Sequence, residues 1–251
     1  INGVEGDLNS VNPADVESVS VLKDASSAAI YGARGAFGVI LVTTKNATAG
    51  KTKINYNGSF SMHQRTVKTE DGIVSNGLQW TDGWYTAYLE GQEAPPGGIN
   101  NVFKYSTDWY NELVRRDADP SLDKVRVNDK GEYEYFGNTN WLDIIYKDQN
   151  YSTEHNVSIS GGNERARYYV SGRYYNQDGI YNAGDEKYTQ YNIRSKGEIQ
   201  INKSLLLENN TDVMIFRSHQ PMVMYDRQNI TRQAQHQGYP VTMEKNPDGT
   251  W

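Results

Sequence analysis

Strict alternation of apolar and polar residues marks most of the chain from residue 51 onward. Ile54, Tyr56, Phe60 and Met62 share one face of a run whose other face holds Lys, Asn and Ser. Because successive side chains of a strand point to opposite faces, this pattern predicts a strand over residues 54–62. Similar runs predict further strands over residues 156–160, 165–175, 189–201 and 205–215. The longer runs reach about ten residues, which is the length of a tilted membrane-spanning strand.

The connections between these predicted strands alternate in length. Residues 63–150 form a long connection, 161–164 a tight turn, 178–187 an intermediate connection and 202–204 another turn, and the chain from 217 is long again. Outer-membrane barrels combine short periplasmic turns with longer extracellular loops. The order therefore predicts a membrane barrel in which residues 63–150 are an extracellular loop.

The long connection is predicted to carry helices of its own, because a structureless segment of that length is uncommon in a compact domain. Apolar spacing and capping residues place these helices at residues 78–90, 107–116 and 141–146. Trp80 and Trp84 are four residues apart and share one face of the first helix.

The first 45 residues have a different texture and predict a small mixed α/β unit. Asn12 before Pro13 is a helix start, with a capping side chain followed by a proline at the first helical position. Strands are expected over residues 16–22 and 37–44, with a short helix over 25–31 between them. We place a domain boundary between residues 48 and 49.

Composition excludes several classes of protein. The 251 residues contain no cysteine, so a disulfide framework and a thiolate metal site are absent. The formal net charge is -6 and the Lys and Arg residues are dispersed, which disfavours nucleic-acid binding. No apolar run is long enough for a transmembrane helix. The first residue, Ile1, and the final turn-like residues 246–251 indicate an internal fragment of a longer protein.

Residues 12–45 carry a specific family resemblance. They read NPADVESVSVLKDASSAAIYGARGAFGVILVTTK, which resembles the end of the plug domain of TonB-dependent outer-membrane transporters, and in particular the SusC/RagA branch. Siderophore-type receptors usually have Gly-Pro where this chain has Asp24-Ala25. A weaker resemblance to the family's early barrel covers the stretches NWLDII at residues 140–145 and VSISGGN at 157–163, and extends over 168–180.

The resemblance implies a mainly β fold. Residues 1–48 would be the C-terminal part of an α/β plug domain. Residues 49–251 would be the first antiparallel strands of a multi-pass transmembrane β-barrel. The family implies about 22 strands, within the range known for outer-membrane barrels. Residues 63–150 would form its long helical extracellular loop. Such a protein lies in the outer membrane of a Gram-negative bacterium, surrounded by membrane lipid and lipopolysaccharide.

The resemblance also implies a function, namely TonB-dependent import of a large nutrient. The first choice of cargo is an oligosaccharide or other glycan, taken up together with a SusD-like surface lipoprotein that forms a lid. The TonB-ExbB-ExbD complex would supply energy through a segment absent from this chain. The alternative cargo is a peptide or a siderophore or other metal chelate. A soluble β-rich glycan-binding or adhesin module is an alternative of another class, but it leaves the plug-like stretch unexplained.

Candidate site residues fall into three groups, each with an ordinary structural alternative. Glu17 and Arg34 are candidates for contacts between plug and barrel, or they are solvated charges. Trp80, Trp84 and Trp109 lie in the long connection, where they would stack on sugar rings or pack the helices. The third group shares one face of a predicted strand and would line the lumen, contacting plug, water or cargo: Arg165, Arg167, Tyr169, Arg173 and Tyr175.

No catalytic constellation, metal site or cofactor is predicted, so the protein is not expected to be an enzyme. The four histidines have no ligand spacing. Asp117, Asp119 and Asp123 flank Pro120 and offer oxygen ligands that suit Ca²⁺, although such a turn is more often merely solvated.

Overall fold

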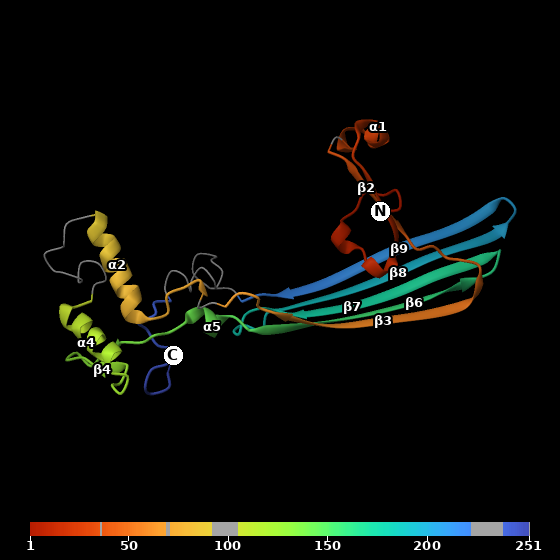
Figure 1. Ribbon diagram of the computed structural model, residues 1–251. Helices are drawn as coiled ribbons and strands as arrows, with labels where there is room; N and C mark the ends of the chain where they lie inside the picture. The colour runs from red at the N-terminus through yellow and green to blue at the C-terminus, as the bar shows by residue number, and fades with distance from the viewer. Residues whose placement is uncertain (36, 69–70, 92–104, 222–237, 251) are drawn as a thin grey trace. The chain divides into compact units, whose positions relative to one another are not determined.

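The computed structural model describes residues 1–35, 37–68, 71–91, 105–221 and 238–250 (Figure 1). The chain forms two compact units. We call the first the strand unit, made of Ile1–His63, Asn150–Gly179 and Glu186–Gln220, and the second the connection unit, made of Gln64–Gln149, Ile180–Asp185 and Pro221–Trp251. No helix within the described ranges is long and apolar enough to cross a membrane.

The strand unit begins with the predicted α/β segment. Two single-turn 3-10 helices, η1 (Leu8–Ser10) and η2 (Pro13–Asp15), precede β1 (Val16–Leu22). A short helix α1 (Ala25–Ala28) and a 3-10 stretch η3 (Ala29–Gly35) lead to β2 (Val39–Thr44), which pairs antiparallel with β1. The predicted elements are therefore confirmed, with the second strand starting two residues later than expected. Gly32 has φ 63°, a conformation that favours glycine.

The five long strands form one sheet in the order β3-β6-β7-β8-β9 (Figure 1). They are β3 (Gly50–Gln64), β6 (Gln149–Gly162), β7 (Ala166–Asp178), β8 (Lys187–Asn202) and β9 (Leu205–His219). The pairs from β6 to β9 are antiparallel. All five predicted strands are confirmed, and within the described residues the sheet is open. Several are longer than predicted; β6 starts seven residues early because Tyr151 is the one aromatic side chain among residues 149–154 and a single such residue does not show the alternation.

The two faces of this sheet are opposite in character. On β7, Tyr168 and Val170 are exposed, whereas Tyr169 and Ser171, which alternate with them along the strand, are buried. β8 repeats the pattern, since Tyr191 and Ile193 are exposed and Gln190, Asn192 and Arg194 are buried. On β7 and β8 the exposed face is thus apolar and the covered face is polar, whereas β3 is exposed on both faces.

Within its described residues the connection unit contains three helices, all of which the sequence predicts. They are α2 (Gly77–Gly91), α4 (Thr107–Ala118) and α5 (Trp141–Ile145). Two short strands, β4 (Val125–Val127) and β5 (Tyr133–Tyr135), pair antiparallel between α4 and α5. The Ser106 hydroxyl caps α4 by accepting a hydrogen bond from the Trp109 backbone N–H at 3.0 Å.

A small hydrophobic core holds the connection unit together, built from Trp109, Leu113, Phe136 and Val241. The Trp109 ring stacks on Phe136 with centroids 5.8 Å apart, and its indole Nε1 donates to the Tyr135 carbonyl at 3.1 Å. A buried tryptophan is usually stabilised in this way, because its ring stacks on a neighbour and its indole N–H keeps a hydrogen-bond partner.

Residues 238–250 join this core by strand-like hydrogen bonds. The Gly137 N–H donates to the Val241 carbonyl at 2.7 Å, and the Thr139 N–H donates to the Pro240 carbonyl at 2.9 Å. Glycine is needed at 137, because a Cβ there would lie 2.6 Å from the Thr242 carbonyl oxygen. Two segments about 100 residues apart in sequence are therefore fixed side by side.

Candidate functional site

The N-terminal segment of the strand unit is held against the polar face of the sheet through the carboxylate of Asp15. The Tyr169 hydroxyl donates to one oxygen of Asp15 and the Ser171 hydroxyl to the other, both at 2.7 Å. The Asn12 amide adds a longer hydrogen bond of 3.3 Å. Asp15 is only 2% exposed. A carboxylate removed from water in this way requires such donors, because burial without them is costly.

Local sequence explains how Asp15 reaches this position. The Asn12 side chain caps η2 by accepting a hydrogen bond from the Ala14 N–H at 3.1 Å, and Pro13 starts the turn. Asp15 ends that turn and points toward β7. Its backbone carbonyl accepts a hydrogen bond from the Lys45 N–H at 2.8 Å, which ties the end of β2 to the same place.

Two side chains of β8 hold the N-terminal segment at further points. The Asn192 amide donates to the Ser10 carbonyl at 2.8 Å. The Lys196 ammonium donates to the Asn46 side chain at 2.7 Å and to the Thr44 carbonyl at 3.2 Å. Together with Asp15, these contacts attach the segment to two neighbouring strands through hydrogen bonds.

Other charges on the polar face pair with each other along the sheet. The Arg194 guanidinium, 2% exposed, contacts the Asp212 carboxylate at 2.5 Å and the Asn210 side chain at 3.3 Å. Arg173 pairs with Glu154 on β6 at 3.0 Å and lies over the Tyr175 ring. The positive charges of these arginines are therefore neutralised by carboxylates of the same sheet.

The candidates for lumen-facing residues thus have different surroundings. Tyr169 contacts the N-terminal segment through Asp15, and Arg173 and Tyr175 lie together on the polar face. Arg167 pairs with Glu198 on β8 at 2.8 Å. Arg165 lies in the turn before β7, because the strand begins at Ala166.

Glu17 is exposed on β1, and its carboxylate interacts electrostatically with the Lys196 ammonium of β8. The side chain of Arg34 lies outside the described residues. The hydrogen-bonded contact is made two residues before Glu17, by Asp15, which sequence reasoning missed because an acidic residue in the first turn of a helix is ordinary. The only available signal was its position directly after the Asn-Pro helix start.

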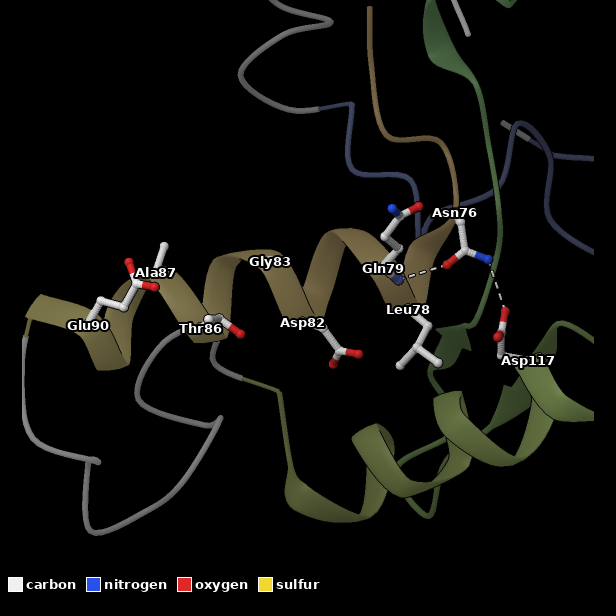
Figure 2. Close-up of a pocket in the computed structure, with 9 residues that line it drawn as sticks. All are labelled: Asn76, Leu78, Gln79, Asp82, Gly83, Thr86, Ala87, Glu90 and Asp117. Carbon is white, nitrogen blue, oxygen red and sulfur yellow. Dashed lines mark hydrogen bonds between the residues drawn. The ribbon is translucent and has the colours of Figure 1, made fainter. Parts of the chain in front are cut away.

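The connection unit contains a hollow of about 640 Å³ beside α2, which we call the α2 hollow (Figure 2). At one end, the Asn76 side chain caps α2 through the Gln79 N–H at 2.7 Å and donates to the Asp117 carboxylate of α4 at 3.1 Å. Polar side chains line the hollow: Asn76, Gln79, Asp82, Thr86, Glu90 and Asp117.

Asp82 in this lining links α2 to α4. The Tyr110 hydroxyl donates to the Asp82 carboxylate at 2.7 Å. This hydrogen bond, together with burial, raises the pKa of Tyr110 to about 12. The hydroxyl therefore keeps its proton, and remains a donor, at neutral pH.

The three candidate tryptophans do not share one environment. Trp109 is 2% exposed and lies inside the core, where its ring stacks with Phe136 and Tyr105; for this residue the structure shows the packing alternative. Trp80 is half-buried and packs on Tyr239, with centroids 5.2 Å apart. Trp84 is 56% exposed.

Residues considered for metal binding have other partners. His63 contacts the Ser152 hydroxyl, His155 contacts the Tyr56 hydroxyl, and His236 lies outside the described residues. The Asp119 carboxylate closes a turn by accepting hydrogen bonds from the Ser121 N–H and hydroxyl, which lowers the pKa of Asp119. The part of the chain that the structure describes contains no group of three or more potential metal ligands.

Comparison with known proteins agrees with this arrangement. A family model described as the TonB-dependent receptor plug domain matches residues 1–39. TonB-dependent receptor SusC of Bacteroides thetaiotaomicron is 34% identical over 72% of this chain, and TonB-dependent receptor P26 of Formosa agariphila is 32% identical over 81%. The chain spans only 14% and 17% of these relatives' lengths.

Solved structures give the same answer for the fold. The RagAB peptide importer in its open-open state matches with a TM-score of 0.61 and 26% identity, over 92% of this chain and 25% of that chain. The RagAB peptide transporter matches with a TM-score of 0.58 over 84% of this chain and 23% of that chain, also at 26% identity. The plug-domain match, the relatives and the solved structures together show that this chain belongs to the SusC/RagA type of TonB-dependent receptors.

Proposed function

We propose that the intact protein imports a large nutrient, in the first place an oligosaccharide, across the outer membrane. Residues 1–48 are the C-terminal part of the plug, and residues 49–251 are the first part of the barrel, with 63–150 as an extracellular loop. The two-faced sheet supports this proposal: its apolar face suits lipid, and its polar face carries the N-terminal segment.

The observation that carries the proposal is the buried carboxylate of Asp15. A plug has to stay in its barrel at rest and still be able to move during import. Among the described residues, two hydroxyls and an amide hold the Asp15 carboxylate, and none of these donors is an arginine or a lysine. Breaking such a contact does not separate two buried opposite charges, which would be the more costly step. The arrangement therefore combines a fixed position with reversible release.

Three partners belong to the proposal. A SusD-like lipoprotein would cover the extracellular side, and the TonB-ExbB-ExbD complex would drive the plug from the other side. Lipid and lipopolysaccharide would cover the apolar face. Arg167, Arg173 and Tyr175 would line the lumen, where their pairing with wall carboxylates fixes the charge pattern that cargo meets.

A peptide is the second candidate cargo. It is favoured by one observation, the likeness to the RagAB peptide importer over 92% of the chain. That likeness concerns the shared architecture of plug segment and strands. The cargo is expected to be chosen by the connection unit, where surface loops differ most among relatives.

The proposal is tested by replacing Asp15 with Ala in the full-length receptor. This change leaves two buried hydroxyls without their acceptor, and each unsatisfied group costs about 1–3 kcal/mol. We expect a loosened plug, seen as increased passive entry of a large antibiotic such as vancomycin into cells that produce the variant. Glu17→Ala is the matched control, because the nearby Glu17 carboxylate is exposed and meets the sheet by charge attraction to Lys196 rather than by buried hydrogen bonds. Equal vancomycin entry in both variants would contradict the plug assignment.

Cargo is tested in the same strain. Cells that depend on the receptor should grow on an oligosaccharide mixture and should lose that growth when the receptor gene is deleted. Deletion that abolishes growth on peptides instead would overturn the glycan assignment and leave the transporter assignment standing.

A further inference from the structure

The exposed ring of Trp84 is the starting point for a binding site on the connection unit. A tryptophan is among the largest apolar side chains, and one that is 56% exposed contributes little to its own domain's core. Among the described residues its ring partner is Trp80, with centroids 6.3 Å apart and planes inclined by 62°. This inclined contact and the 56% exposure leave part of the Trp84 ring accessible to a ligand.

The support beneath Trp84 is rigid. Trp80 packs on Tyr239, and the Tyr239 carbonyl accepts hydrogen bonds from the Trp141 indole at 3.1 Å and from the Thr242 hydroxyl at 2.6 Å. The start of α2 is fixed as well, because the Gly77 N–H donates to the Asn138 side chain at 2.6 Å. Trp84 is thus presented in a fixed orientation, which lowers the entropic cost of binding a ligand.

The α2 hollow lies on the adjacent side of the same helix. At about 3.6 residues per turn, Gly83 and Ala87 fall between the Trp80 and Trp84 stripe and the polar stripe of Gln79, Thr86 and Glu90. Gly83 and Ala87 both line the hollow, and Figure 2 shows them along α2 between the larger polar side chains. Nothing lies within 4 Å of the position that a Cβ of Gly83 would take, so this strip is low and open.

The chemistry of the hollow defines the ligand. Two amides and one hydroxyl both donate and accept hydrogen bonds, and three carboxylates accept them, while no Lys or Arg is among the described residues of the lining. A ligand with many hydroxyl groups meets these requirements, and an anionic ligand is repelled. A flat apolar ring face next to such a polar surface matches a pyranose ring, which has an apolar C–H face and hydroxyls around its edge.

We propose that Trp84, supported by Trp80 and Tyr239, stacks on a pyranose ring of a neutral oligosaccharide whose hydroxyls hydrogen-bond the side chains of the α2 hollow. This inference rests on the proposed import of glycans and adds the site of first contact. It also adds selectivity: glycans that carry carboxylate or sulfate groups are excluded by Asp82, Glu90 and Asp117.

The test uses the purified full-length receptor in detergent and isothermal titration calorimetry. The probes are neutral hexaoses of α-glucan, β-glucan, mannan and xylan, an acidic hexaose of galacturonate, and a hexapeptide mixture. At least one neutral hexaose should bind the wild type, and Trp84→Ala should weaken it by about tenfold, which corresponds to one stacking contact. Trp84→Phe, which keeps a flat ring, should lose less than threefold.

Val127→Ala is the matched control, because Val127 is an exposed apolar residue on β4, outside the described lining of the α2 hollow. It should bind like the wild type, and thermal unfolding of all variants should be unchanged. The site is overturned if Trp84→Ala binds the neutral hexaose normally, if no neutral hexaose binds the wild type, or if galacturonate binds as well as the neutral glycans.

Uptake separates failure of the site from failure of the proposed function. If receptor-dependent uptake of a neutral glycan persists in cells producing Trp84→Ala at wild-type rates, the site is wrong and the transport function stands. If the receptor imports and binds peptides only, the site and the glycan assignment both fail, and the transporter assignment stands.

Discussion

The two units of this chain bury opposite kinds of side chain. In the connection unit, Trp109, Leu113 and Phe136 are inside, and the buried charged side chain of Arg116 is paired with Glu112. In the sheet of the strand unit, Ile193 and Tyr191 are exposed while Asn192 and Arg194 are covered. The connection unit therefore buries apolar side chains, and the sheet covers polar ones.

The difference teaches which solvent each unit is built for. Apolar side chains gain free energy by leaving water, at about 25 cal/mol per Å² of area removed. The connection unit obtains this gain by packing its own core. Within the described residues the apolar face of the sheet stays uncovered, so under the proposed function the same gain would come from lipid. On β7 and β8, side chains of the polar face form hydrogen bonds with the N-terminal segment.

The largest expected effect comes from a substitution that destabilises the connection unit and leaves the strand unit unchanged. Trp109→Ala leaves a cavity at the centre of its core and should cost about 3–5 kcal/mol of that unit's unfolding free energy. Hydrogen-exchange mass spectrometry on the full-length receptor should show faster exchange in peptides from residues 107–118 and 133–143, with β7 and β8 unchanged.

Trp84→Ala provides the control for that substitution. It removes the same side chain from a position that is 56% exposed, and exchange should stay near the wild-type rate. If Trp109→Ala accelerated exchange equally in β7 and β8, the two units would be one cooperative structure and the comparison would fail.

A second substitution tests the lipid assignment of the apolar face. Ile193 is 59% exposed in the middle of β8, between Gly172 and Val213 on the neighbouring strands. Ile193→Arg should cost about 2–4 kcal/mol in a bilayer, the penalty for a charge on the lipid face of a barrel. Urea titration of the receptor in phospholipid vesicles measures it.

Leu89→Arg is the matched change in the connection unit. Leu89 is 39% exposed on α2, and an arginine there should change stability by less than about 0.5 kcal/mol, because it faces water. Equal small costs at both positions would mean that the apolar face of the sheet does not face lipid.

Much of the fold could be predicted, because both periodic signals are local. Alternation located all five strands of the sheet, and helix caps such as Ser106 and Asn140 located α4 and α5. Strand ends were less accurate where both faces are polar, as at the start of β6. The pairing of residues 137–139 with 240–242 was not predictable, because it depends on packing around Gly137 rather than on a pattern.

The candidate site was harder to predict than the fold. Glu17 and Asp15 are both acidic and two residues apart, and nothing local reveals which one meets Tyr169 and Ser171 across about 150 residues of sequence. Similarly, Trp84 and Trp109 differ only in what surrounds them. Burial of a single side chain is decided by tertiary contacts, and sequence spacing constrains only which residues share a face.

The smallest expected effect concerns the hydrogen bond that joins helices α2 and α4 of the connection unit. Tyr110 follows the core residue Trp109 on α4, and its hydroxyl reaches across to Asp82 on α2. Tyr110→Phe removes this hydrogen bond and should cost about 1 kcal/mol near neutral pH. Urea unfolding of the solubilised receptor, followed by tryptophan fluorescence at several pH values, measures the difference from the wild type.

The pH dependence distinguishes this hydrogen bond from simple packing. The pKa of Tyr110 is raised to about 12 in the folded state, above the value of about 10 for an unfolded tyrosine. A raised pKa contributes stability that is fully present below pH 10 and is lost as the pH rises toward 12, because the unfolded state then releases its proton first. The difference between wild type and Tyr110→Phe should therefore shrink above pH 10. A difference that stays constant from pH 8 to pH 11 would show that the hydroxyl does not join the two helices, and that α2 is held by the core and by Asn76 alone.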